Sequence, residues 1–350
     1  MARLTRINRP HMCNEYDVIA CGITSVKSKI PLYYYPTQVV FVDDNPEFLD
    51  ALSLTFSHEF NVKVFDNTDS ALTYINEAQR EAKLIADEDK PKLQGDSDAW
   101  VKRVLTHQNI KRFDELRVQE VSVLVVDYSM PTMNGIDFCE KIKNSSIKKI
   151  LLTGYATPAE AVRAFNNNTI HYYLKKNSEN MQQELKEAIQ QLQHAYFNEL
   201  SSSLKAEAID SGTPFFADPQ LAYYFEQACT KLEVVEHYFL SNPSRFELRA
   251  KDGSTHCCVI YTEEDMEEHT QILVEEGAPA DLHTAIASRK FVPLFHTEDG
   301  FYEPRMPNAK TSIHPSTLIQ GAVNYYCAVI ADKTATTPQN IDTPTKGLLH

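Results

Sequence analysis

The sequence contains no apolar run approaching the roughly twenty residues that a membrane-spanning helix needs. The residues after Arg3, Arg6 and Arg9 are polar, so we expect no secretion signal. Hydrophobic residues make up 43% of the chain and charged residues 23%, as is typical of soluble globular proteins. We therefore expect a cytoplasmic protein that does not enter a membrane.

Cysteine and histidine lack the spacings that create redox pairs or zinc sites. The seven cysteines include no C-x-x-C pair, and the twelve histidines include no H-x-x-x-H or H-E-x-x-H motif. We expect the cysteines to be reduced packing residues, as in a cytoplasmic compartment, and we expect no zinc site.

Positive charge is scarce, above all in the second half of the chain. The formal net charge is -14, and from residue 205 onward 21 acidic side chains face 11 basic ones, a net of −10. Nucleic acids bind to clustered Lys and Arg. This half also shows no pair of short helices with a basic recognition face. We therefore do not expect this half of the chain to bind nucleic acid.

The sequence does contain apolar strands that end in reactive side chains. The segment Val123–Val126 ends at Asp127 and is followed by a turn containing Asn134-Gly135. Taken alone, Asp127 could simply cap a strand and start the turn. However, the earlier strand 38–42 ends at Asp43 and Asp44 in the same way.

Two further strands complete this set. The segment 149–152 ends at the hydroxyl of Thr153, and the segment 170–174 ends at Lys175 and Lys176. In a parallel sheet the carboxyl ends of the strands meet at one edge, where ligands bind. Three carboxylates placed together raise one another's pKa, and a hard cation such as Mg²⁺ relieves this repulsion. A carboxylate nucleophile, a cation, a lysine and a hydroxyl are the groups that phosphoryl transfer needs.

These motifs, in this order, resemble the receiver domain of two-component response regulators. The motifs are V-D-D-N, V-V-D-Y-S-M-P-T-M-N-G, L-L-T-G-Y-A and I-H-Y-Y-L-K-K. The resemblance implies an α/β, flavodoxin-like (CheY-like) fold with a doubly wound, five-stranded parallel sheet. It also implies phosphorylation by a sensor histidine kinase or a phosphotransfer protein. The receiver would catalyse only its own phosphorylation and dephosphorylation.

The resemblance also assigns roles to individual residues. Asp127 is the expected phosphoacceptor, and Thr153 and a lysine are expected to bind the phosphoryl group. The expected lysine is Lys176 rather than Lys175, because in the family one residue separates the aromatic-Leu pair, here Tyr173-Leu174, from the lysine. Tyr173 is then the expected switch aromatic, although it could be an ordinary sheet-edge residue. The expected Mg²⁺ ligands are Asp43, Asp44, Asp127 and the backbone carbonyl of Ser129. The chain departs from the family at Asn177, where a proline is usual.

The receiver is expected at residues 38–180, with an insertion at about 87–121. An extension, residues 1–37, precedes it and contains Tyr33, Tyr34 and Tyr35. We expect these tyrosines to pack on their own domain; an arm that docks a partner is the alternative. The insertion is expected to be an exposed elaboration, or else a contact for a kinase or another domain.

A single helix is expected from residue 181 through a linker segment ending at 210. Its apolar residues recur at near-heptad steps, as in a short two-stranded coiled coil. The first turns should pack on the receiver as its last helix, and the remainder could join two chains as a homodimer. Packing of this remainder on the next domain is the alternative. The seam consists of Met181, Leu185, Ala188, Leu192, Ala195, Leu200 and Leu204.

Residues 215–333 are expected to form an α+β output domain with an antiparallel sheet of three or more strands. Its expected elements are a helix at 219–231, a hairpin of 246–250 and 256–261 turning at Asp252-Gly253, one or two helices within 263–290, and strands at 292–296 and 325–330. The tail, 334–350, is rich in Thr, Pro and Lys and is expected to be disordered.

We interpret the chain as a response regulator in which phosphorylation switches dimerisation or the interactions of the output domain. No recognised enzymatic motif occurs in the output domain, so its activity is left open. A phosphorylation-controlled enzyme or nucleotide-binding output is one alternative, and a DNA-binding transcription regulator is another. In architecture the chain resembles the quorum-sensing response regulators of Legionella.

Overall fold

The structure is a computed structural model, and the chain in it divides into two compact units. The first unit contains residues up to 31 and residues 36–217, and the second contains residues 32–35 and those from 218 onward. Most of the N-terminal extension, most of the expected insertion and the C-terminal tail lie outside the described residues. The structure describes residues 30–77, 115–154, 158–202, 205, 214–241, 244–297, 299–306 and 309–331. Within these residues no helix is both long enough and apolar enough to cross a bilayer.

The first unit is built on a five-stranded parallel sheet in the order β3-β2-β4-β5-β6. Its central strands are buried on both faces, which explains why they are continuous apolar runs rather than alternating ones. This arrangement confirms the predicted flavodoxin-like, doubly wound fold. The strands are β2 (Gln38–Val42), β3 (Asn61–Phe65), β4 (Val121–Asp127), β5 (Lys148–Thr153) and β6 (Tyr172–Lys175).

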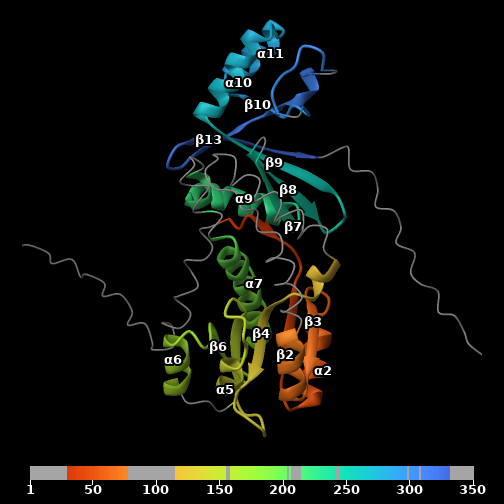
Figure 1. The fold of residues 1–350 in the computed structure, drawn as a ribbon, viewed down its shortest axis with the longest axis vertical. Coiled ribbons are helices and arrows are strands. Elements are labelled where there is room, and N and C mark those ends of the chain that lie inside the picture. The colour runs from red at the N-terminus through yellow and green to blue at the C-terminus, as the bar shows by residue number, and fades with distance from the viewer. Residues whose placement is uncertain are drawn as a thin grey trace, which may run out of the picture. The chain divides into compact units, whose positions relative to one another are not determined.

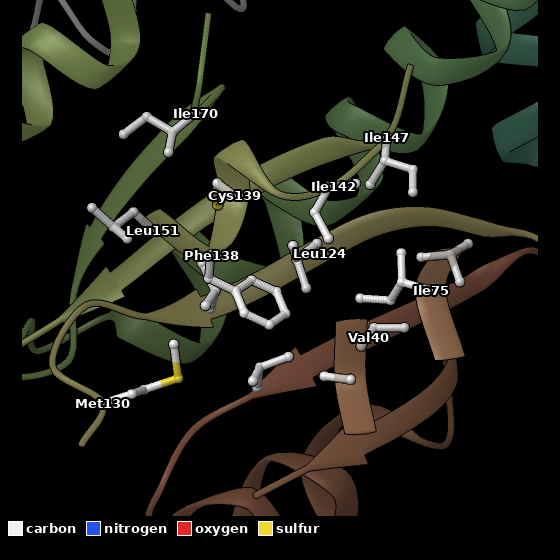
Figure 2. Close-up of a cluster of buried hydrophobic side chains, with 14 of the residues drawn as sticks. Val40, Ile75, Leu124, Met130, Phe138, Cys139, Ile142, Ile147, Leu151 and Ile170 are labelled. Carbon is white, nitrogen blue, oxygen red and sulfur yellow. The ribbon is translucent and has the colours of Figure 1, made fainter. Parts of the chain in front are cut away.

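Helices cover both faces of this sheet. Helices α2 (Pro46–Phe56) and α7 (Met181–Leu200) pack on the face that carries Val39 and Phe41. Helices α5 (Gly135–Glu140) and α6 (Pro158–Asn166), with helical residues 68–77, pack on the opposite face. Figure 2 shows this second cluster, with Phe138 of α5 beside Leu124 of β4. A short 3₁₀ helix, η2 (Glu115–Gln119), precedes β4.

Helix α7 ends at Leu200, so the single helix predicted from 181 to about 210 is interrupted at Ser201. The carbonyl of Phe197 accepts both the hydroxyl of Ser201 at 2.6 Å and the backbone N–H of Ser201 at 3.0 Å, and the backbone N–H of Lys205 bonds to the carbonyl of Ser201 at 2.9 Å. Residues 202 and 205 are helical again, while 203–204 and 206–210 lie outside the described residues.

The apolar seam of α7 packs within its own unit. Leu185, Ala188 and Leu192 belong to the core cluster under the sheet, as predicted for the first turns. Further along, Gln193 donates to Thr37 at 3.2 Å, and the hydroxyl of Tyr196 donates to Glu120 at 2.5 Å. Because much of the seam is already covered by the receiver, α7 offers little free apolar surface for a coiled coil. The homodimer remains a prediction.

The second unit contains a six-stranded antiparallel sheet in the order β1-β7-β8-β9-β13-β12, as expected of an α+β domain. Helix α9 lies on one face (Figure 1). There Phe225 packs on Phe246 with 4.5 Å between ring centroids. Helices α10 and α11 lie on the other face, where Met266 packs with Val259 and Tyr261. The strands are β1 (Tyr33–Tyr34), β7 (Val234–Ser241), β8 (Ser244–Ala250), β9 (Thr255–Thr262), β12 (Thr317–Gln320) and β13 (Asn324–Ala331), and the helices are α9 (Pro219–Lys231), α10 (Glu263–Glu275) and α11 (Ala280–Ala287).

Several predicted elements of this unit are confirmed. Helix α9 has the predicted bounds, and β8 and β9 form the predicted hairpin, with Gly253 at a φ of 83° in the turn. Two helices, α10 and α11, occupy the region 263–290, and Gly277, with a φ of 63°, lies between them. The sequence did not predict β7 or β12. The strand expected at 292–296 is the shorter β10 (Phe291–Pro293), which pairs with β11 (Ile313–Pro315), also missed. Two 3₁₀ helices, η3 (Pro214–Ala217) and η4 (Ala309–Ser312), complete the described elements.

Strand β1 shows that the tyrosine segment belongs to the second unit, so the prediction that it packs on the receiver is wrong. Tyr33 lies opposite Tyr238 and Tyr34 opposite His237 in an antiparallel ladder. The rings of Tyr34 and His237 stack with 5.9 Å between centroids, and Tyr33 is buried. The physical reason is that β7 would otherwise be an open sheet edge, which β1 covers.

We expect a disulfide to form between positions 33 and 238 in a Tyr33→Cys/Tyr238→Cys variant. The backbone N–H of Phe239 bonds to the carbonyl of Leu32 at 2.7 Å, so residues 32 and 239 form a hydrogen-bonded pair of the antiparallel ladder. The neighbouring pair, 33 and 238, is then a non-hydrogen-bonded pair, in which the two Cα atoms lie closer together, as a disulfide requires. Peptide mass spectrometry without reduction would detect the crosslink. The control, Tyr34→Cys/Tyr238→Cys, should not crosslink, because its side chains point to opposite faces. Equal crosslinking of both variants would contradict the register of β1.

A second prediction concerns His171, whose Nδ1 accepts the backbone N–H of Lys149 at 3.1 Å and must therefore be neutral. Burial, followed by the charges of Lys148 and Lys149, lowers the pKa of His171 from 6.5 to about 4. In the unfolded chain His171 binds a proton near its ordinary pKa, so the free energy of unfolding should fall as the pH drops through this window. A shift of that size corresponds to roughly 3 kcal/mol at most.

Urea unfolding at about pH 7 and about pH 5 would measure this loss in wild type and in His171→Asn. The Asn Oδ1 can accept the same backbone N–H but does not titrate. We expect the wild type to lose more stability than the variant on acidification. An equal loss in the two proteins would show that His171 does not carry the effect.

Candidate functional site

Strand β4 brings Asp127 to the carboxyl edge of the receiver sheet. All seven residues of the strand are buried, and Asp127 itself is 5% exposed. Its Oδ2 accepts the backbone N–H of Ser129 at 2.7 Å, so the carboxylate is held by its own turn. The turn is tight, since a Cβ at Gly135 would lie 2.2 Å from the carbonyl oxygen of Asp127. Asn134 then caps α5 by accepting two backbone N–H groups. The tight turn and the capped helix therefore fix the direction of the Asp127 side chain.

Strand β2 ends beside β4 and contributes the other two carboxylates. Asp43 is 3% exposed and accepts the backbone N–H of Asn45 at 3.0 Å, whereas Asp44 is exposed. One oxygen from each of Asp43, Asp44 and Asp127 lies within 4.8 Å of the others. The structure thus brings together the three carboxylates that the sequence predicted would meet.

Lys176 lies between two of these carboxylates. Its Nζ is 2.6 Å from Oδ2 of Asp43 and 2.8 Å from Oδ1 of Asp127. Lys175, the neighbouring lysine at the end of β6, is exposed. The spacing argument that preferred Lys176 therefore selected the residue that lies at the site.

The electrostatics of the site follow from burial and these ion pairs. Burial raises the pKa of Asp43, and the bonds from Lys176 and Asn45 offset this only in part. For Lys176, burial alone would lower the pKa, but hydrogen bonds with Asp127 and Asp43 raise it overall. The site is therefore an anionic cluster that holds one ammonium ion tightly.

The remaining predicted residues lie on the strands around this cluster. Thr153 ends β5, is 1% exposed, and its carbonyl accepts the backbone N–H of Lys176 at 2.9 Å. Tyr173 lies opposite Leu151 in the sheet, is half-buried, and packs against the core cluster of Figure 2. Ser129 is exposed next to Asp127.

One residue of the site was missed by the sequence reasoning. The ring of Phe48, in the first turn of α2, has its centroid 4.7 Å from Nζ of Lys176. These residues are far apart in the sequence, and a single phenylalanine in an amphipathic helix carries no signal of such a contact.

The donor set fits a hard divalent cation. All three carboxylates offer oxygen ligands, which Mg²⁺ prefers. Two residues of the site, Asp44 and Ser129, are exposed, so water can reach it. Three carboxylates meet here, and Lys176 pairs with only two of them, so one ammonium does not neutralise the cluster. A cation with two charges would complete that neutralisation.

Comparison with known proteins agrees with this geometry. Residues 84–190 match the family model of the response regulator receiver domain. This match includes β4 to β6 with Asp127, Thr153 and Lys176, and it begins in the segment between β3 and β4. The structure adds β2 with Asp43 and Asp44, which precede the matched residues. None of the curated protein sequences compared with the chain matches it.

Among solved structures, the response regulator LqsR of Legionella pneumophila is similar over most of both chains. It is 26% identical, with a TM-score of 0.69, and the match covers 87% of this chain and 89% of that one. A CheY-like receiver domain protein of Methanospirillum hungatei is 17% identical, with a TM-score of 0.33 over 47% of this chain and 98% of its own. The signal receiver domain of a putative Luxo repressor of Vibrio parahaemolyticus is 15% identical, with a TM-score of 0.32 over 47% of this chain and 96% of its own.

The site geometry, the family match and the similarity to LqsR agree with one another and with the resemblance that the motifs indicated. The chain carries a response regulator receiver domain, and its similarity to response regulators supports its identification as a two-component response regulator.

Proposed function

We propose that the receiver accepts a phosphoryl group on Asp127 from a sensor histidine kinase or a phosphotransfer protein, with Mg²⁺ bound beside it. The observation that carries this proposal is the convergence of Asp43, Asp44, Asp127 and Lys176 at one edge of the sheet. Three carboxylates at such short range repel one another, and Lys176 pairs with only two of them, which favours the binding of a further cation.

Each residue has a defined part in this reaction. A carboxylate oxygen of Asp127 forms the new bond to phosphorus while the bond from phosphorus to the donor's imidazole nitrogen breaks. The ammonium of Lys176, already 2.8 Å from Asp127, is placed to neutralise the oxygens of the incoming group. The hydroxyl of Thr153 would donate a hydrogen bond to one of those oxygens.

The metal would be held by Asp43, Asp44, Asp127 and the backbone carbonyl of Ser129. When bound, Mg²⁺ supplies positive charge to the phosphoryl oxygens. Oδ1 of Asp43 accepts the backbone N–H of Asn45, and this hydrogen bond fixes the orientation of the Asp43 carboxylate.

Phosphorylation would then be read out through Tyr173 and the second unit. A new dianion gains charge-assisted hydrogen bonds, and these can tip a packed element between two states. We propose that Thr153 moves towards the phosphoryl group and that Tyr173 moves inward behind it. The output is a change in homodimerisation or in the interactions of the second unit, within the cytoplasm.

The first test is Mg²⁺-dependent phosphorylation of the full chain by acetyl phosphate. Wild type should take up one phosphoryl group, and Asp127→Asn should take up none, because an amide is not a nucleophile of this kind. Electrophoresis in a phosphate-binding gel would separate the two forms. The conservative variant keeps the size of the side chain, so loss of the core is not the explanation. Undiminished phosphorylation of Asp127→Asn would show that Asp127 is not the phosphoacceptor.

The second test separates the two lysines. Lys176→Met should slow phosphorylation at least tenfold, since a lost charge contact in a buried site costs about 1.4 kcal/mol or more. The matched control is Lys175→Met, which changes the adjacent, exposed lysine and should react nearly as fast as wild type. Initial rates with acetyl phosphate would be compared. A greater loss in Lys175→Met than in Lys176→Met would reverse the assignment.

A further inference from the structure

The aromatic face of Phe48 covers the ammonium that joins two carboxylates of the site. Nζ of Lys176 lies 4.7 Å from the ring centroid, within the range of a cation–π contact. The same Nζ bonds to Asp43 and Asp127 at 2.6 and 2.8 Å. The lysine side chain is 24% exposed, so the ammonium is partly removed from water and the ring contact is not fully screened.

Phe48 is itself held in place by the metal-binding segment. Asp43 accepts the backbone N–H of Asn45 at 3.0 Å, and the side chain of Asn45 accepts the backbone N–H of Phe48 at 3.1 Å. Because Lys176 then bonds back to Asp43, these four residues form a closed ring of contacts. The ring of Phe48 also packs against the core cluster beneath α2, which restricts its rotation. Its orientation therefore depends on the same turn that presents the carboxylates.

An aromatic ring suits this position for a physical reason. Lysine has a flexible stem and a strongly hydrated head, so it needs contacts that fix its direction. A further carboxylate would hold the ammonium too strongly to release it towards an incoming phosphoryl group, and an aliphatic side chain would exclude water without attracting the charge. The face of a phenyl ring attracts a cation and adds no net charge.

We propose that Phe48 is a positioning residue for Lys176 in phosphoryl transfer, acting through the cation–π contact of its ring. This inference rests on the proposed function, because it assigns Phe48 an effect on the reaction of Asp127. Phe48 orients the ammonium between the carboxylates of β2 and β4, where the phosphoryl oxygens arrive.

Substitution at position 48 tests the role of the ring. Phe48→Leu should be phosphorylated by acetyl phosphate about 3- to 10-fold more slowly than wild type, a loss that corresponds to about 0.6–1.4 kcal/mol. Phe48→Tyr keeps the ring and should restore the rate to within about twofold of wild type. Leu54→Ala serves as a control on the same helix, at a side chain that is 75% exposed and outside the core clusters. It should react like wild type.

A fluorinated phenylalanine series separates the charge of the ring from its shape. One, two and three fluorine atoms at position 48 progressively weaken the negative ring face while leaving its size almost unchanged. The phosphorylation rate should fall in step with fluorination. This series remains decisive if Phe48→Leu folds poorly. Equal rates across the series would overturn the cation–π role, as would equal rates in Phe48→Leu and Phe48→Tyr.

A spectroscopic readout tests the contact without any phosphorylation. In the full chain labelled with ¹³C at lysine Cε, the ring current of Phe48 should shift the Lys176 signal upfield, and Lys176→Met would identify that signal by its loss. The shift should disappear in Phe48→Leu and persist in Phe48→Tyr. A Lys176 signal that is unmoved by Phe48→Leu would contradict the contact. If the contact is present but wild type takes up no phosphoryl group, the proposed function fails and with it the role of Phe48 in the reaction.

Discussion

The ammonium of Lys176, held between Asp43 and Asp127, is the interaction on which the receiver site depends. Two buried carboxylates of the same charge share one edge of the sheet, and without the lysine their repulsion would favour protonation or displacement of one of them. The buried parallel sheet makes this arrangement possible, because β2, β4 and β6 end at the same edge and none of them can shift without exposing core residues. The proposed cation and phosphoryl group would then enter a site whose side chains are already held in place.

The second unit depends on residues that precede the receiver in the sequence. Strand β1 closes the edge of its sheet, and only Tyr35, Pro36 and Thr37 separate β1 from β2, the strand that leads to Asp43 and Asp44. Thr37 is buried and bonds to Ser122 at 2.6 Å, so the start of β2 is fixed within the receiver. A fragment that begins at residue 215 would therefore lack the edge strand of its own sheet.

The sequence predicted the features that depend on neighbouring residues. It did not predict contacts between segments that are far apart in the chain. Carboxylates directly after apolar strands, and a lysine at a fixed step from an aromatic-Leu pair, located the site, because strand ends are visible in the order of residues. Asp252-Gly253 located the hairpin for the same reason. The pairing of β1 with β7 and the contact of Phe48 with Lys176 join residues more than one hundred positions apart, and no local pattern records them. The role of the second unit could not be predicted, because its sequence contains no motif that we recognise.

The most direct test of the central claim is to locate the phosphoryl group chemically. An acyl phosphate is reduced by borohydride, which converts the modified aspartate to homoserine, and peptide mass spectrometry then identifies its position. After incubation with acetyl phosphate and Mg²⁺, we expect homoserine at position 127 and no conversion at positions 43 and 44. Homoserine at either of those positions, or at none, would contradict it.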